Sequence, residues 1–110
     1  MSFNYEPSKS SLRADTVVEF VGRSLLEFRM QEIPGVGPAS ITKFEEHGIY
    51  TPAQILAKFL SYVDGPDVTA QQVCEGFYNW AKPIMGKANT HNLTFALANY
   101  AGEHGLFRYE

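Results

Sequence analysis

The chain has 110 residues, of which 45% are hydrophobic and 19% are charged, values typical of one globular domain rather than of a disordered chain. Nine Lys and Arg against twelve Asp and Glu give a net charge of −3. This charge argues against nucleic-acid binding, because phosphate-binding proteins are usually basic overall, although a local basic patch stays compatible with it. The single cysteine, Cys74, excludes an internal disulfide and is typical of a reducing compartment.

The start of the chain is polar and serine-rich, and residues 1–12 are expected to form a flexible N-terminal tail ahead of a single domain, residues 13–110. No apolar run approaches the length of a membrane span, and the N-terminus lacks the apolar region of a signal peptide. We therefore expect an intracellular protein without membrane insertion.

The next residues predict a series of short helices. Asp15 is expected to cap the first, and its apolar pattern continues past Gly22, which either ends this helix or lies within it. Gly37 before Pro38 is typical of a helix N-cap followed by proline at the first helical position. Gly48 is typical of the left-handed residue that ends such a helix.

Three further helices are expected downstream. Capping boxes begin two of them, Thr51 with Gln54 and Thr69 with Gln72, and Asn89 is expected to cap the last. No segment shows sustained period-two alternation. The sequence therefore predicts an all-α fold, a compact five-helix domain that contains a helix-hairpin-helix motif.

The residues between the first two helices, IPGVG, have the form apolar-x-Gly-apolar-Gly that is typical of a helix-hairpin-helix. Ile33 and Val36 are expected to anchor the turn in the core, while the glycines leave no side chain between backbone and ligand. The following helix presents unpaired N–H groups and the positive end of its dipole, and both attract phosphate. Contacts to phosphate alone would make binding nearly independent of base sequence. The expected cradle consists of the amides of Gly35, Gly37, Ala39 and Ser40, with Lys43 one turn further on.

The same residues have a simpler interpretation. Gly-x-Gly can merely join two helices at a sharp angle, with Pro38 as the start of the second. A motif this short does not separate the two interpretations, so the rest of the chain is needed.

A larger part of the chain, about residues 16–100, resembles the barrier-to-autointegration factor family of small metazoan chromatin proteins. The closest stretch, IPGVGPASITKFEEHGIYTPAQILAKFL, runs without a gap against the family's hairpin and next helix, and FYNWAK matches its Phe-x-x-Trp-x-Lys. The resemblance implies an all-α homodimer that binds double-stranded DNA without sequence preference and bridges two duplexes. It also implies binding of LEM-domain proteins in a groove at the dimer interface, and a nuclear and cytoplasmic location.

The resemblance also assigns roles to residues. The DNA-contacting positions of the family fall on Gly35, Val36, Gly37, Ala39, Ser40 and Lys43 at the hairpin, and on Lys87, Asn89, Thr90 and His91 near the last helix. The dimer-forming helix of the family corresponds to the one that carries Ile55, Leu56, Ala57, Phe59 and Leu60. The resemblance implies no metal, no cofactor and no small-molecule substrate.

Three features depart from the family pattern. Basic residues of the family fall here on Thr16 and on Thr90 or His91, with Lys87 close to the second of these positions. The segment between Tyr62 and Phe77 is longer than its counterpart and adds DGPDVTAQQ beside the expected partner groove. The last helix has diverged, and EHGLFRYE extends beyond the match. Loss of cations weakens DNA binding, because each neutralised phosphate contributes to affinity.

Other reactive residue types are assigned structural roles. Cys74 is expected to be a buried thiol rather than a nucleophile. His47, His91 and His104 have no metal-ligand spacing with each other or with Cys74. The sequence contains no catalytic constellation, so we expect a protein that is not an enzyme.

These observations leave two main hypotheses. The first is a homodimeric, sequence-independent protein that binds and bridges double-stranded DNA in chromatin or nuclear organisation. The alternative is a dimeric protein–protein interaction module of the same fold that has lost DNA binding, which the acidic charge and the longer segment 64–72 favour. A third hypothesis is an accessory hairpin domain of a DNA-processing complex.

Overall fold

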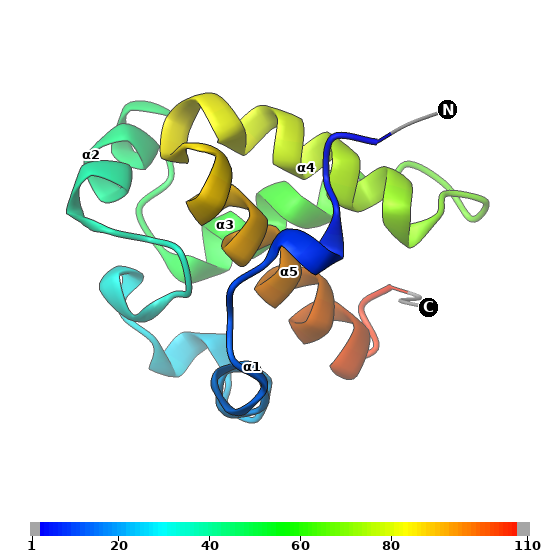
Figure 1. Ribbon diagram of the computed structural model, residues 1–110, viewed down its shortest axis with the longest axis horizontal. Helices are drawn as coiled ribbons and strands as arrows, with labels where there is room; N and C mark the ends of the chain where they lie inside the picture. The colour runs from blue at the N-terminus through cyan, green and yellow to red at the C-terminus, as the bar shows by residue number, and fades with distance from the viewer. Residues whose placement is uncertain (1–2, 108–110) are drawn as a thin grey trace.

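The computed structural model describes residues 3–107, which fold into five α-helices and three short 3₁₀ turns (Figure 1). The α-helices are α1 (Ala14–Val21), α2 (Pro38–Glu46), α3 (Pro52–Leu60), α4 (Ala70–Met85) and α5 (Lys87–Glu103), and the 3₁₀ turns cover Pro7–Lys9, Leu25–Glu27 and Met30–Glu32. Residues 3–107 contain no strand, so the expected all-α fold of five helices is confirmed.

The two longest helices, α4 and α5, form the centre of the domain and share its largest helix–helix contact. Gly86 alone joins them, with a φ of +86° that a residue with a side chain rarely adopts. α1 packs on α5, whereas α2 and α3 pack on α4 (Figure 1). Aromatic rings fill the core between these layers; the ring centroids of Phe59 on α3 and Phe77 on α4, for example, are 5.6 Å apart.

Local capping explains where three of the helices begin or end. The side chain of Thr51 accepts a hydrogen bond from the amide of Gln54 at the start of α3, and Thr69 accepts one from Gln72 at the start of α4, as predicted. Gly48 follows α2 with a φ of +77°, as expected for a left-handed helix end. The N–H of the next residue, Ile49, then bonds back across the last turn of α2.

The region before the hairpin resolves the alternative left open at Gly22, because the first helix ends there. α1 begins one residue before Asp15, which therefore lies inside the helix rather than at its cap, and it ends before Gly22. Ser24 and Glu27 then form their own capping box around a 3₁₀ turn. The element that leads into the hairpin is a second 3₁₀ turn, Met30–Glu32, so the helix-hairpin-helix motif lacks an α-helix on its first side.

The N-terminal segment is packed, which corrects the prediction of a flexible tail over residues 1–12. Residues 3–12 cross α4 and α5 (Figure 1), and the side chain of Tyr5 is only 2% exposed. The carboxylate of Glu75 accepts hydrogen bonds from the backbone N–H groups of Asn4 and Tyr5, at 3.0 and 2.9 Å. Further along, Asn92 accepts one from the N–H of Ser11 at 2.8 Å. The domain therefore includes this segment, because burial of an aromatic ring and these bonds hold it; Met1 and Ser2 lie outside the described residues.

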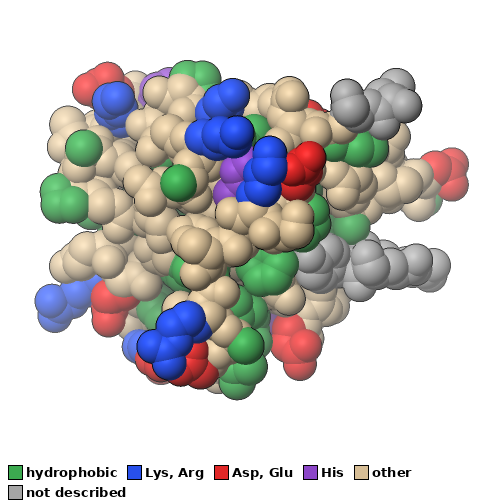
Figure 2. All heavy atoms as spheres, in the orientation of Figure 1, with side chains coloured by type: hydrophobic (Ala, Val, Ile, Leu, Met, Phe, Trp, Pro, Cys, Tyr) green, Lys and Arg blue, Asp and Glu red, His purple; other side chains and the backbone are tan. Residues whose placement is uncertain are grey.

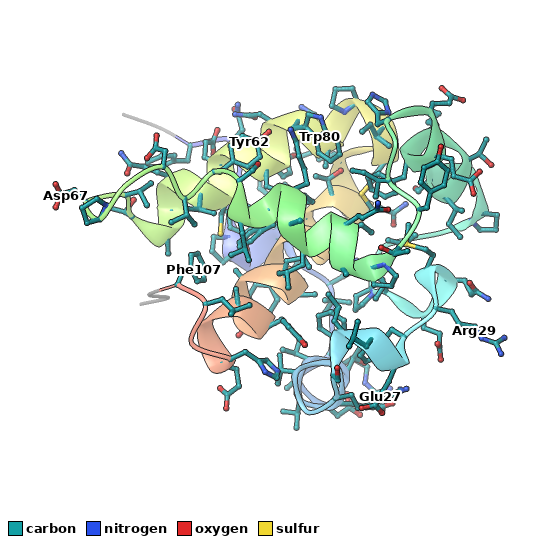
Figure 3. All side chains as sticks on the ribbon, turned by 180° about the vertical axis from the view of Figure 1, so that it is seen from behind. Glu27, Arg29, Tyr62, Asp67, Trp80 and Phe107 are labelled. Atoms are coloured by element: carbon teal, nitrogen blue, oxygen red, sulfur yellow. The ribbon has the colours of Figure 1, made fainter. Side chains whose placement is uncertain are left out.

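A turn projects from one end of the domain (Figure 1). Residues 61–69 connect α3 to α4, and Figure 3 shows Asp67 at the tip of this turn, pointing away from the helices. None of the helices between residues 3 and 107 is both long and apolar enough to cross a bilayer.

Candidate nucleic-acid interface

The hairpin is a tight turn held by its own backbone. The N–H of Val36 donates to the carbonyl oxygen of Ile33 at 3.0 Å, with Pro34 and Gly35 as the two central residues. Proline followed by a residue with positive φ, here +84° at Gly35, is the pattern of a type II turn. Ile33 and Val36 are both buried, which confirms that they anchor the turn in the core.

The two hairpin glycines differ in whether the fold requires a residue without a side chain. A Cβ atom on Gly35 would lie 2.5 Å from the carbonyl oxygen of Asn89 and 3.2 Å from the amide nitrogen of Leu93, so this glycine lets the turn pack on α5. Gly37 has a φ of −111°, and no atom beyond its two chain neighbours lies within 4 Å of the place that its Cβ would occupy. The fold therefore requires glycine at position 35, whereas position 37 faces open space.

A groove of about 460 Å³ separates the start of α2 from the junction of α4 with α5. Its walls are Gly37, Pro38, Ala39, Ser40 and Lys43 on one side and Lys82, Pro83, Ile84, Met85, Gly86 and Asn89 on the other. The groove therefore brings together most of the hairpin residues that the sequence predicted with Asn89, one of the residues predicted near the last helix.

Backbone donors are available along this groove. Val36 donates within the turn and Ile41 donates to Gly37, but the amides of Gly37, Ala39 and Ser40 donate to no acceptor in the described part of the chain. Unpaired amides at the start of a helix attract anions, since they add to the positive end of the helix dipole.

Two lysines flank the groove from different helices. Lys43 lies in the last turn of α2 and Lys82 in the last turn of α4, and both side chains are exposed. Neither forms an ion pair with any residue from 3 to 107. In the sequence, Lys82 appears only as part of the FYNWAK match and is not among the predicted DNA-contacting residues. Its place in the last helical turn before Gly86 could have indicated that it lies beside the start of α5.

The structure removes three predicted residues from the DNA-contacting set, and it buries a fourth, Ser40, to 6% exposure, which leaves only its backbone amide as a candidate. Val36 has a buried side chain, and its amide is used within the turn. Thr90 is fully buried, and its hydroxyl donates to the carbonyl oxygen of Gly86 at 2.7 Å. His91 is 1% exposed because α5 begins at Lys87, before the predicted cap, and therefore carries this residue onto the buried side of the helix.

The N-terminal segment covers His91. Its ring packs against Tyr5 and Tyr78, with centroids 5.7 and 4.5 Å away. The Nε2 atom of His91 accepts a hydrogen bond from the N–H of Glu6 at 3.3 Å, so Nδ1 carries the proton that it shares with the carbonyl oxygen of Lys87 at 3.0 Å. Of the four residues predicted near the last helix, only Lys87 and Asn89 are therefore exposed.

Lys9 is a further cation on this face, close to Lys87. It was not predicted as a site residue, because residues 1–12 were expected to form a flexible tail. The Nζ atom of Lys9 lies 3.0 Å from a carboxylate oxygen of Glu6. This hydrogen bond raises the pKa of Lys9 and lowers the pKa of Glu6, whose carboxylate Lys87 also stabilises by charge. Lys and Arg side chains gather on this face over the start of α5 and the N-terminal segment (Figure 2).

The residues predicted to form a dimer interface divide into two groups. Ile55 and Phe59 are buried within the protomer, where they serve its own core, so their side chains do not reach a partner. Ala57 is exposed, and Leu56 and Leu60 are half-buried, so these three remain on the surface of α3. The dimer itself stays a prediction.

The remaining reactive groups fit structural roles. Burial of Cys74 raises the pKa of its thiol to about 12, so the thiol stays protonated at neutral pH, as expected for a buried cysteine. Within residues 3–107, no three His, Cys, Asp or Glu side chains lie close enough together to hold a metal ion.

No protein-family model, no curated protein and no solved structure matches this chain. The likeness to the barrier-to-autointegration factor family therefore remains a hypothesis based on the motifs quoted above.

Proposed function

We propose that the protein binds double-stranded DNA without sequence preference and, as a homodimer, bridges two duplexes in chromatin or nuclear organisation. The observation that carries this proposal is the groove in which the unpaired amides of Gly37, Ala39 and Ser40 lie with Lys43 and Lys82. In this proposal the protein is a binding protein rather than an enzyme, present in nucleus and cytoplasm.

The chemistry of the groove supports a phosphate ligand. Backbone N–H groups and lysine side chains can contact phosphate oxygens. The DNA backbone presents these oxygens alike at every base pair, so such contacts do not distinguish one base sequence from another. One groove offers only a few contacts, and a single protomer therefore binds weakly. Two grooves on one dimer gain affinity because the second contact forms at a high effective concentration.

The sharpest test changes Gly37, because this position tolerates a side chain. Aspartate and asparagine are both good N-cap residues, so Gly37→Asp and Gly37→Asn should leave α2 intact. Gly37→Asp places a carboxylate at the amides, whereas Gly37→Asn places a neutral group of the same shape there. Gly35→Glu is unsuitable, since any side chain at position 35 would collide with Asn89.

Fluorescence anisotropy of a labelled duplex at low and moderate salt measures the effect. We expect Gly37→Asp to weaken binding at least about tenfold, because its carboxylate repels phosphate and its oxygen can accept from the same amides. Gly37→Asn can cap these amides too but carries no charge, so we expect it to weaken binding less. An absence of binding by the wild type at low salt, or equal binding by the two variants, would contradict the proposal.

A protein–protein interaction module is the second candidate function. The net charge of −3, the burial of Thr90 and His91 and the projecting turn at residues 61–69 favour it. Its partner would be a LEM-domain-like protein or another protein that binds this turn. The module is favoured if the chain dimerises, ignores DNA at low salt, and captures a partner only when residues 64–72 are present.

A further inference from the structure

A second concavity lies between α1 and the chain that leads into the hairpin. It has a volume of about 100 Å³ and is lined by Thr16, Glu19, Phe20, Phe28, Glu32 and Pro34, none of which lines the groove at α2. Pockets for drug-sized ligands span roughly 300–1,000 Å³, so this cleft fits the head group of one side chain rather than a nucleotide or a metabolite. We refer to it as the α1 cleft.

The apolar part of the α1 cleft is aromatic. The ring centroids of Phe20 and Phe28 lie 5.2 Å apart, and Phe28 is only half-buried. The guanidinium carbon of Arg23 lies 4.2 Å from the centroid of the Phe28 ring. This ring therefore already binds one guanidinium within the protein, which agrees with the attraction of aromatic faces for cations.

The polar part of the cleft is acidic. Glu19 comes from α1 and Glu32 from the 3₁₀ turn before the hairpin, and both are exposed. Neither carboxylate has an ion-pair partner among residues 3–107. Glu32 accepts a hydrogen bond from the backbone N–H of Arg29 at 2.7 Å, but Figure 3 shows the side chain of Arg29 pointing away from the domain. Arg23, whose guanidinium lies over the Phe28 ring, does not line the cleft, so two carboxylates without an ion-pair partner lie beside its aromatic wall.

We propose that the α1 cleft binds an arginine side chain of a partner protein. Arginine fits better than lysine because its planar guanidinium can stack flat on an aromatic ring while its five N–H donors reach two carboxylates, whereas the compact ammonium of lysine has no flat face to stack. The site is separate from the groove at α2, so it does not depend on DNA binding. Its partner segment is basic, which complements the acidic rim.

Binding of a small arginine mimic to the full-length chain tests this site. N-ethylguanidinium is titrated into the ¹⁵N-labelled protein at constant ionic strength and followed by ¹H–¹⁵N correlation spectra. N-ethylurea, its neutral isostere, and ethylammonium, a lysine mimic, are the matched probes. We expect saturable shifts at the amides of Thr16, Glu19 and Glu32 with N-ethylguanidinium and weaker or no saturation with the other two.

The protein variants use a control with the same change in net charge. Glu19→Gln with Glu32→Gln should weaken N-ethylguanidinium binding at least about tenfold through loss of two charge-assisted contacts. Glu45→Gln with Glu46→Gln, on the exposed surface of α2, should leave it unchanged. Glutamine at position 32 keeps the oxygen that accepts from Arg29, and Glu19→Gln alone, which removes no hydrogen bond, serves if the double variant unfolds.

Each outcome decides the proposal. Saturable binding that the cleft variants lose and the α2 variants keep supports it. Equal response to N-ethylurea or ethylammonium, binding that survives in the cleft variants, or equal loss in the α2 variants overturns it.

Discussion

Gly35 lies directly against Asn89: a Cβ atom on this glycine would be 2.5 Å from the Asn89 carbonyl oxygen. The hairpin is therefore seated on the first turns of α5, and the position of α2 depends on that contact. Because the start of α2 and Asn89 form opposite walls of the groove, one backbone contact sets the width of the candidate binding site.

Replacement of this glycine tests the contact. We expect Gly35→Ala to lower the free energy of unfolding by at least about 2 kcal/mol, since a positive φ costs an L-residue roughly 1–2 kcal/mol and the overlap with Asn89 adds to it. Urea denaturation measures the change. Gly37→Ser, at the neighbouring open position, should cause no loss because serine is a good N-cap. Equal stability of Gly35→Ala and wild type would mean that the hairpin does not rest on α5 in solution.

The two groove lysines should be visible in the salt dependence of DNA binding, a prediction that rests on the proposed function. Each phosphate contact contributes about −0.9 to the slope of log K against log salt concentration. We therefore expect Lys43→Ala and Lys82→Ala each to reduce the slope by about one, in anisotropy titrations across a range of salt. Lys58→Ala is the control, since Lys58 lies outside the groove with its Nζ atom 4.8 Å from the centroid of the Trp80 ring. A slope that falls equally in all three variants would argue against the groove.

Tyr5 should stabilise the domain even though it lies near the start of the chain. Tyr5→Ala removes a large buried ring, and we expect the free energy of unfolding to fall by about 2–4 kcal/mol. Ser8→Ala, at an exposed position of the same segment, should change it by less than about 0.5 kcal/mol. Chemical denaturation of both variants gives the comparison. An unchanged denaturation midpoint for Tyr5→Ala would favour the earlier prediction that the N-terminal residues form a flexible tail.

Cys74 should be unreactive in the folded protein. With its pKa raised to about 12 from a usual 9.0, the thiol is protonated at pH 8, and we expect a thiol reagent to modify it rapidly only after unfolding. The neutral thiol contributes stability that is fully present below about pH 9 and is lost as the pH rises towards 12. Cys74→Ala should remove this part of the alkaline decline, measured as the difference between the two proteins. Fast modification of the native thiol at pH 8 would contradict its burial.

The elements that follow local signals are those that the sequence predicted well. The capping boxes at Thr51 and Thr69 and the left-handed end of α2 at Gly48 depend only on residues within one helical turn, and the structure has all three. The break after α1 was left open, because Gly22 is compatible with both a helix end and a helix interior.

The features that the sequence analysis missed depend on residues far apart in the chain. The burial of Tyr5 follows from Glu75 and His91, which meet the N-terminal segment only after α4 and α5 pack. Gly76, inside α4, is explained by Tyr62, because a Cβ atom on Gly76 would lie 2.5 Å from that ring. The sequence likewise predicted both hairpin glycines as one motif. Only the position of Asn89 in the folded chain shows that glycine is required at position 35 and not at position 37.

The projecting turn at residues 61–69 gives the domain a place where chain length can change at little cost. Its tip, marked by Asp67, points away from the packed helices, and exposed turns of this kind tolerate insertion. A fluorophore or short epitope inserted between Gly65 and Pro66 would therefore report on the protein while the core, the groove and the α1 cleft stay unaltered.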